Sequence, residues 1–382
     1  MIYVHIPFCR SFCTYCDFYS EIASDCSGQK GFAQALSAEI SARSAEIRQN
    51  IRTQPGVHTL YIGGGTPSVL PLTVFRRMLD DLSAAGAEGP FDEFTVEVNP
   101  EDIVEKGHAY AEGLLELGVN RVSMGVQSFD DDILKWMNRR HDSERARKAY
   151  MILEEAGFDN ISIDLIFGLP QLSSQNWIAN IEKALEISPS GRLPKHISSY
   201  QLSVEEGSAL ARMLASGKWI EASDEVCAGQ YEILCSLLAE AGYGHYEISN
   251  FSLKGYEAVH NSAYWRHLPY VGLGPGAHSF SFPDVRKWND PNLKAYLEAA
   301  KTGDFGKVSG GETLTAEQLR IERIMLALRT SEGLSEEDVR EVGLGPSVSN
   351  LVAQGKLQET DGGIRIPEAG FFISDSIISE LV

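Results

Sequence analysis

Three cysteines lie close together near the start of the chain, in the spacing Cys9-x-x-x-Cys13-x-x-Cys16. Iron–sulfur cubanes are held by soft thiolate ligands, and four is the usual number. A loop with this spacing can bind three irons and leave the fourth without a ligand from the protein. Catalytic metal sites keep an open position of this kind, at which a small molecule can coordinate. The spacing therefore predicts a 4Fe–4S cluster with one open iron.

A zinc knuckle is the alternative interpretation of the same cysteines. Zinc would need a fourth ligand, and His5 is the only candidate nearby, although it lies within a predicted strand. The remaining cysteines, Cys26, Cys227 and Cys235, fit no ligand spacing. Six cysteines in 382 residues are too few for a disulfide scaffold, so the clustered thiols indicate a metal in a reducing compartment.

The elements that must position the cysteine loop follow a regular alternation. Apolar runs of strand length alternate with amphipathic stretches, which predicts a parallel sheet with right-handed crossovers. Polar and glycine residues cluster just after the strands, where the ligand face of a barrel or an open sheet lies. Periodicity leaves a doubly wound sheet as the alternative. The expected strands are 1–6, 58–62, 94–98, 121–126, 161–167 and 196–202, and the expected helices are 32–48, 72–84, 109–117, 130–156 and 177–187.

The pattern changes after residue 205. A long helical stretch reaches about residue 241, and residues 242–290 are rich in Gly, Tyr, His and Trp. From about residue 314 we expect three helices, a hairpin turning at 361–363 and a last helix, with Ser335 and Asp338 in a capping box. We therefore predict three domains: a core barrel over 1–205, an α+β extension over 206–312 and a winged-helix-like domain over 313–382.

Charge and hydropathy exclude several classes of partner. The formal net charge is −20, which disfavours nucleic acid or an anionic membrane as the main partner, and the last domain is itself rich in Asp and Glu. The first residues lack the features of a secretory signal, and no apolar stretch reaches the length of a membrane span. We expect a soluble cytoplasmic protein.

Residues suited to a small ligand follow the cysteine loop in order. The run Tyr61-Ile-Gly-Gly-Gly-Thr66-Pro67 ends the second expected strand, and glycines let a backbone approach a ligand closely. Glu97 lies near the end of the third strand, where a carboxylate can accept from hydroxyls or an ammonium. Asp164 places a charge inside an apolar run, which is costly unless it has a partner.

The segment HIPFCRSFCTYCDFYS at 5–20 resembles the radical S-adenosylmethionine (SAM) proteins, in the group of the oxygen-independent coproporphyrinogen III oxidases and related heme chaperones. The resemblance spans nearly the whole chain. It implies an α/β fold, a partial (β/α)6 barrel with an α+β extension and a winged-helix-like C-terminal domain. It also implies a 4Fe–4S cluster on Cys9, Cys13 and Cys16, whose reduced form cleaves SAM to methionine and a 5′-deoxyadenosyl radical. The SAM-binding residues implied are Tyr3, Tyr15, Gly64, Gly65, Thr66, Glu97, Gln127, Arg139 and Asp164.

Two departures favour the chaperones over the oxidases. The oxidases have a fourth cysteine two residues after the third, where this chain has Phe18. They also carry a substantial extension before the cluster, whereas here the cluster strand is expected from residue 1.

A third feature matches the HNxxYW motif of the chaperones: His260, Asn261, Tyr264 and Trp265. A histidine can ligate heme iron, and aromatic rings offer flat faces to a porphyrin. The alternatives are that His260 is a structural histidine among core aromatics, or that another histidine of the region, His245, His267 or His278, meets the iron.

The resemblance therefore implies a heme chaperone with heme as its cargo and respiratory heme proteins at the membrane as recipients. Oxidative decarboxylation of coproporphyrinogen III is the alternative function. The heme ligand, the recipient, the oligomeric state and the turnover of SAM stay open at this stage.

Overall fold

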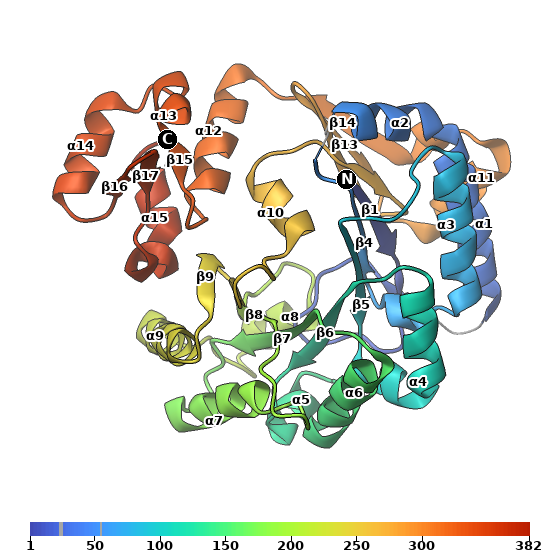
Figure 1. Cartoon of the computed structure of the whole chain (residues 1–382), viewed down its shortest axis with the longest axis horizontal. Helices are drawn as coiled ribbons and strands as arrows, with labels where there is room; N and C mark the ends of the chain where they lie inside the picture. Colours follow the sequence, from blue (N-terminus) through green and yellow to red (C-terminus); the bar gives the residue numbers. More distant parts are fainter. Residues whose placement is uncertain (23–25, 54–55) are drawn as a thin grey trace.

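The computed structural model describes residues 1–22, 26–53 and 56–382. Six parallel strands lie side by side in chain order, without the reversal that a doubly wound sheet requires. The predicted partial (β/α)6 barrel is therefore confirmed, and Figure 1 shows its strands running through the centre of the molecule. The strands are β1 (Ile2–Ile6), β4 (Thr59–Gly64), β5 (Glu93–Val98), β6 (Arg121–Gln127), β7 (Ile161–Phe167) and β8 (His196–Gln201).

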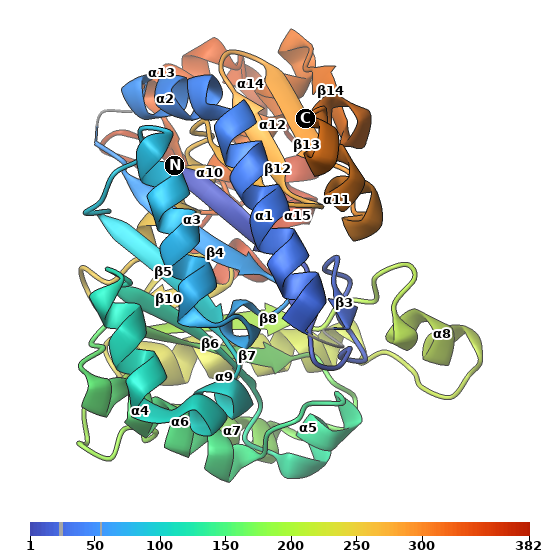
Figure 2. The ribbon, with the colours of Figure 1, turned by 90° about the vertical axis from the view of Figure 1, so that its right-hand side faces the viewer.

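Helices connect these strands and lie outside the sheet (Figures 1 and 2). The strands are buried on both faces, as parallel strands under helices are, and β6 has six consecutive buried residues. Two short strands, β2 (Phe8–Cys9) and β3 (Glu21–Ile22), pair on either side of the cysteine loop. The helices of this part are α1 (Cys26–Ala42), α2 (Ser44–Thr53), α3 (Leu72–Ala84), α4 (Pro100–Glu116), α5 (Asp131–Trp136), α6 (Ser143–Ala156) and α7 (Ser174–Leu185).

Several expected helices have different bounds in the structure, and the stretch expected to run to about residue 241 is two helices, at 209–215 and 224–240. The stretch 130–156 is two helices, because Asn138 adopts a left-handed φ of 59° and Asp142 caps the start of α6. The stretch 32–48 divides between α1 and α2. Helix α4 begins at Pro100, which suits a first helical position, and passes through Gly107 with a φ of 67°. Amphipathic periodicity does not predict such local dihedral angles, so it does not show where a helix ends.

Strands beyond residue 205 extend the same sheet. Strand β11 pairs in parallel with β1, while β10 and β9 add antiparallel strands beyond β8. The nine-stranded sheet therefore crosses the boundary predicted at residue 205, and the division into three domains stays a prediction. The elements of this part are α8 (Ala209–Ala215), α9 (Asp224–Glu240), β9 (Gly244–Glu247), β10 (Asn250–Ser252), α10 (Val259–Trp265), β11 (Val271–Leu273), β12 (His278–Ser281), β13 (Val285–Asn289), α11 (Leu293–Thr302) and β14 (Ser309–Thr313).

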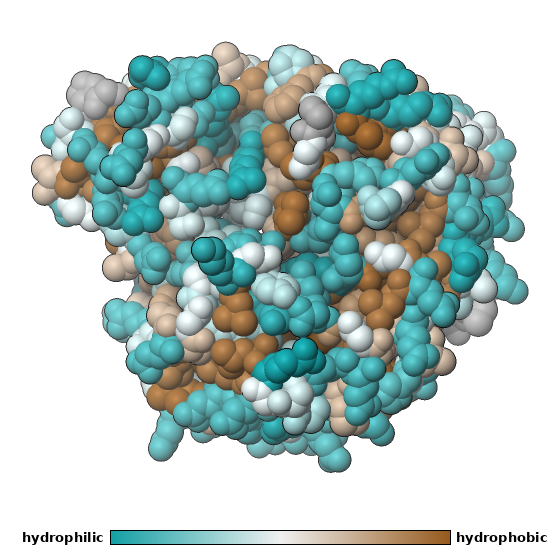
Figure 3. Space-filling view, viewed as in Figure 1, coloured by the Kyte–Doolittle hydropathy of each residue, from teal (hydrophilic) through white to brown (hydrophobic). Residues whose placement is uncertain are grey.

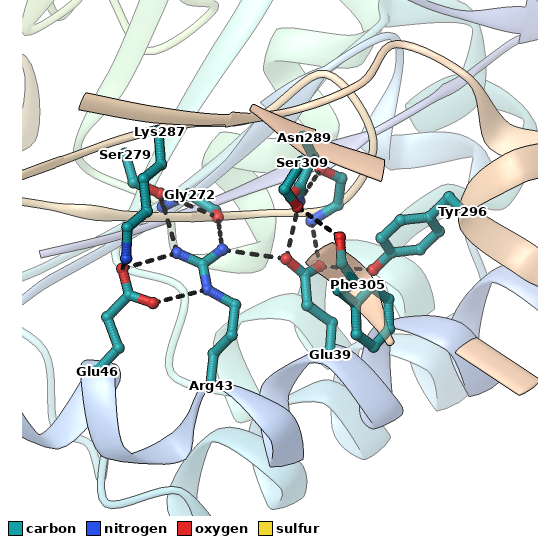
Figure 4. Close-up of polar contacts among 11 residues, drawn as sticks. Glu39, Arg43, Glu46, Gly272, Ser279, Lys287, Asn289, Tyr296, Phe305 and Ser309 are labelled. Atoms are coloured by element: carbon teal, nitrogen blue, oxygen red, sulfur yellow. Dashed lines mark hydrogen bonds and ion pairs between the residues drawn. The ribbon is translucent and has the colours of Figure 1, made fainter. Parts of the chain in front are cut away.

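A buried carboxylate ties α1 to this later part of the chain (Figure 4). Glu39 has no exposed surface, and its oxygens accept from the Gly274 amide at 2.8 Å and the Tyr296 hydroxyl at 2.6 Å. They also accept from Asn289 Nδ2 at 2.8 Å and lie 3.0 Å from Arg43 Nη1. Every one of these partners satisfies the buried charge, so the Glu39 network holds α1 against α11 and β13.

The last part of the chain has the predicted order of helices and a hairpin. A three-stranded sheet in the order β15–β17–β16 lies among its helices, and Ser335 with Asp338 forms the expected capping box. Helix α10 is linked to this part because Arg266 pairs with Glu332 at 2.6 Å and His267 with Glu322 at 3.2 Å. The elements are α12 (Ala316–Ala327), β15 (Leu334–Ser335), α13 (Glu336–Glu341), α14 (Gly345–Ala353), β16 (Gln358–Thr360), β17 (Gly363–Arg365) and α15 (Ser374–Ser379).

Hydrophilic side chains cover much of the face seen in Figure 3, with apolar side chains showing between them. None of the described helices has both the length and the apolar character needed to cross a bilayer.

Candidate functional site

A cavity of about 920 Å³ lies at the carboxyl ends of the parallel strands. It receives side chains from the loops or ends of several strands, as expected for the ligand face of such a sheet. Among the predicted cluster and SAM residues only Tyr3 lies outside its wall. The others all line it: Cys9, Cys13, Tyr15, Cys16, Gly64, Gly65, Thr66, Glu97, Gln127, Arg139 and Asp164.

The cysteine loop is held by backbone contacts on two sides. Thr14 receives a hydrogen bond at its carbonyl from the Leu210 amide at 2.9 Å, at the start of α8. Its own amide donates to the Met137 carbonyl at 3.1 Å, just after α5. Asn138 donates from its side chain to the Phe12 carbonyl at 2.7 Å. The segment between α5 and α6 thus holds the cysteine loop. Its residues are used for these contacts instead of continuing the single helix expected over 130–156.

All three motif cysteines are free thiols and partly buried. Cys9 Sγ lies 3.3 Å from the Thr66 hydroxyl, and Arg139 donates to Cys13 Sγ at 3.5 Å. Burial raises the pKa of Cys9, and raises the pKa of Cys16 to about 12. The Arg139 guanidinium opposes this rise in the pKa of Cys9, because a positive charge favours the thiolate that binds metal.

The structure gives no support to a single zinc ion. His5 is buried, with Nδ1 3.0 Å from the Tyr3 hydroxyl and Nε2 2.8 Å from the Tyr19 carbonyl, so neither nitrogen is available as a fourth ligand. Within the described residues no three His, Cys, Asp or Glu side chains converge closely enough for one ion. In a cubane each cysteine binds a different iron, so its three ligands need not converge on one point.

The glycine run meets the start of the chain as well as the cavity. At Gly64, with a φ of 108°, an added Cβ would lie 2.6 Å from the His5 ring. At Gly65 it would lie 2.7 Å from the Phe8 carbonyl oxygen, and the Gly65 amide donates to Ile6 at 2.8 Å. We expected these glycines to admit a ligand. In the structure they leave room for the neighbouring strand as well, because a Cβ at either position would clash with it.

Glu97 faces the cavity from β5 and is held by two donors. The Tyr61 hydroxyl donates to it at 2.7 Å and the Gly64 amide at 3.0 Å. Burial raises the pKa of Glu97 to about 7, and the Tyr61 hydrogen bond opposes that rise while the nearby Asp164 adds to it.

Asp164 lies in β7, and the Ser123 hydroxyl is 3.1 Å from each of its oxygens. Burial raises the pKa of Asp164 to about 6. Two carboxylates, Asp164 and Glu97, therefore share one cavity, where they favour the binding of a cationic group.

Gln127 is oriented by an irregular backbone, and Arg139 by its hydrogen bonds. Gln127 has a φ of 67° at a register shift between β6 and β7, and such strained residues cluster at ligand sites. Arg139 donates to Asn99 Oδ1 at 2.8 Å and to the Gly125 carbonyl at 2.6 Å. Its Nε is buried and has no hydrogen-bond partner among the described residues.

The HNxxYW residues do not line the cavity. Helix α10 packs behind the wall, and His260 has no exposed surface. Its Nδ1 lies 2.7 Å from the Thr59 hydroxyl and its Nε2 2.9 Å from the Tyr264 hydroxyl. Asn261, Tyr264 and Trp265 are partly exposed. Of the other histidines of the region, His245 is buried, His267 is partly buried, and His278 is exposed.

Sequence reasoning missed several residues of the wall. Tyr61 lies in the glycine motif, and the sequence predicts no role for it, although it orients Glu97. The sequence predicts no role for Asn99 either, although it contacts both Arg139 and Thr66. Its only signal in the sequence is its place before Pro100, at the start of a helix that follows a strand. The exposed rings of Phe12 and Tyr200 carry no periodic signal at all.

The sequence of this chain is similar to those of known proteins. Residues 3–184 match the model described as the radical SAM superfamily. The heme chaperone HemW of Lactococcus lactis is 32% identical over 387 residues, covering 100% of this chain and 96% of that protein. The chain belongs to the HemW family of radical SAM proteins. The heme chaperone HemW of Bacillus subtilis is likewise 32% identical, with 98% and 97% covered. The predicted resemblance to this group is thus confirmed.

The HemW-family chain also shares its fold with a solved structure. The coproporphyrinogen III oxidase HemN of Escherichia coli, a radical SAM enzyme, matches 100% of this chain and 89% of its own at a TM-score of 0.79. The two sequences are 21% identical, so this likeness concerns the fold.

Proposed function

We propose that this chain is a cytoplasmic heme chaperone that binds heme and transfers it to respiratory heme proteins at the membrane. The observation that carries the proposal is the end-to-end similarity to HemW proteins, which includes the extension and the last part of the chain. Fold alone would not distinguish a chaperone from an enzyme, because one fold hosts many functions.

We propose that Cys9, Cys13 and Cys16 hold a 4Fe–4S cluster. Three free thiols on one cavity wall, with a guanidinium beside Cys13, support this assignment. When bound, a reduced cluster of this kind supplies an electron to the sulfonium of SAM.

SAM would occupy the same cavity. Glu97 and Asp164 suit its sulfonium and ammonium charges, and Arg139 suits its carboxylate. The further candidates are Tyr15, Gly64, Gly65, Thr66 and Gln127, with Tyr3 behind the wall.

Heme handling by the HNxxYW motif is part of the proposal. Asn261, Tyr264 and Trp265 are its partly exposed members. His260 could ligate iron only after its hydrogen bonds to Thr59 and Tyr264 break. Exchange of His260 for alanine tests this role directly, since unchanged heme affinity and unchanged heme transfer would refute it.

Oxygen-independent decarboxylation of coproporphyrinogen III is the second candidate, favoured by the HemN-like fold and the complete cavity. One experiment separates the two functions. Anaerobically reconstituted protein is titrated with heme and, separately, incubated with coproporphyrinogen III, SAM and a reductant. We expect stable heme binding and no protoporphyrinogen. Decarboxylation in quantity would make the chain an oxidase.

SAM affinity should depend on pH through Glu97. Protonation below its pKa of about 7 removes a charge that attracts the cationic ligand, so affinity should fall by about tenfold between pH 8 and pH 6. The exchange Tyr61→Phe removes a hydrogen bond that lowers this pKa, so the fall should begin at higher pH. Equilibrium dialysis across this range measures it. Tyr110→Phe, a buried tyrosine that does not line the cavity, is the control, and a flat profile in the unmodified protein would contradict the assignment.

A further inference from the structure

The rim of the cavity gathers exposed aromatic rings. Within the described residues four Phe, Tyr or Trp side chains are exposed, and three of them line this one cavity. They are Phe12 at 54%, Phe18 at 66% and Tyr200 at 43% exposure. Exposed apolar groups that cluster at a concave site mark binding surfaces, whereas scattered ones need no explanation. The fourth exposed ring, Phe282, lies outside the cavity.

These rings stand on backbone that is already held in place. Phe12 and Phe18 flank the cysteines in their loop, and the Phe12 carbonyl accepts from Asn138. Tyr200 lies near the end of β8, within the main sheet. Figure 2 shows α8 projecting beside β3, and the Leu210 amide of α8 bonds to the same loop. A rim that is fixed before a ligand arrives loses little entropy on binding.

The rim also offers one uncommitted positive charge. Arg212, exposed on α8, donates to the Gly207 carbonyl at 2.7 Å and forms no ion pair with a described residue. Of the other cations that line the cavity, Arg139 is assigned to SAM above, Arg10 pairs with Asp102 and Arg140 with Glu105. Carboxylates of Asp17, Glu205 and Glu206 line the same rim. They repel anions, so a ligand of this rim must be largely apolar and can place an acidic group only at Arg212.

We propose that Phe12, Phe18, Tyr200 and Arg212 form a docking platform for heme at the mouth of the SAM cavity. The flat macrocycle lies against the three rings, and a propionate pairs with Arg212. The inference rests on the proposed chaperone function and names the surface that receives the cargo. It places this surface on the cysteine loop and β8, apart from the HNxxYW helix α10.

Heme titration of the full, reconstituted chain tests the platform. We expect the double variant Phe12→Ala/Phe18→Ala to bind heme about tenfold more weakly, and Tyr200→Ala and Arg212→Ala about threefold to tenfold more weakly. Phe282→Ala and Arg76→Ala are matched controls, exposed and outside the cavity, and should stay within about twofold of the unmodified chain. Tyr200→Ala lies outside the cysteine loop, so it keeps the test valid if the double variant loses its cluster.

The dimethyl ester of protoporphyrin IX isolates the charge contact. Unmodified protein should bind the ester more weakly than the free acid, and Arg212→Ala should bind both alike. Equal heme affinity of the Tyr200, Arg212 and control variants would overturn the platform. So would a loss of heme affinity only on exchange of His260 or Trp265, or a loss only of recipient-protein binding in the rim variants. Failure of the unmodified chain to bind heme at all would instead count against the chaperone function.

Discussion

The exchange Cys13→Ala should abolish the charge-transfer absorption of the anaerobically reconstituted protein. Three thiolates are all that this loop offers to a cubane, and His5 is engaged through both of its ring nitrogens. The loss should therefore be complete rather than partial, and bound iron and sulfide should fall with the absorption.

A matched control lies in the same chain. Cys227 is a buried free thiol that does not line the cavity, so Cys227→Ala should leave the absorption and the iron content unchanged. A full spectrum in the Cys13 variant would mean that the ligands are misassigned.

The exchange Glu39→Ala should lower the free energy of unfolding by about 3–5 kcal/mol, the usual result of removing one partner from a buried ion pair. It removes one of the two carboxylate partners of Arg43 and one of the two acceptors of the Asn289 amide, and it leaves the Tyr296 hydroxyl without its acceptor. Urea denaturation followed by circular dichroism measures the change.

Glu46→Ala is the matched control, since Glu46 pairs with the same Arg43 at 3.0 Å but is partly exposed. We expect a loss of about 1 kcal/mol or less, because solvent screens this partly exposed pair. If both variants lost equally little, the Glu39 network would be a minor contributor to the attachment of α1.

The barrel could be predicted from the sequence because each of its strands is a short, largely apolar run. The run at 161–167 is apolar and β-branched around a single charge, and it coincides with β7. The interruption between α5 and α6 was not predicted, because it depends on the left-handed Asn138 and on contacts with the cysteine loop more than 120 residues away in the chain. The pairing of β11 with β1 is a similar long-range outcome.

The candidate site divides along the same line. The spacing identifies Cys9, Cys13 and Cys16, because the ligands of the cluster lie within eight consecutive residues. The burial of His260 is not local, since it depends on Thr59 of a distant strand. Asn99 acquires its contact with Arg139 only when two separate loops meet. Residues whose chemistry depends on such meetings carry no pattern that a single sequence can display.

The position of α10 has a mechanical consequence. On one side His260 contacts Thr59 of β4, two residues from the Tyr61 that holds Glu97. On the other side Arg266 and His267 pair with Glu332 and Glu322. Helix α10 and the two residues after it thus connect the cavity wall to the C-terminal part of the chain. Suppose that a ligand in the cavity shifts α10 and so alters the affinity for a partner at the C-terminal helices. That partner then alters the affinity for the ligand by the same factor, because such coupling is reciprocal.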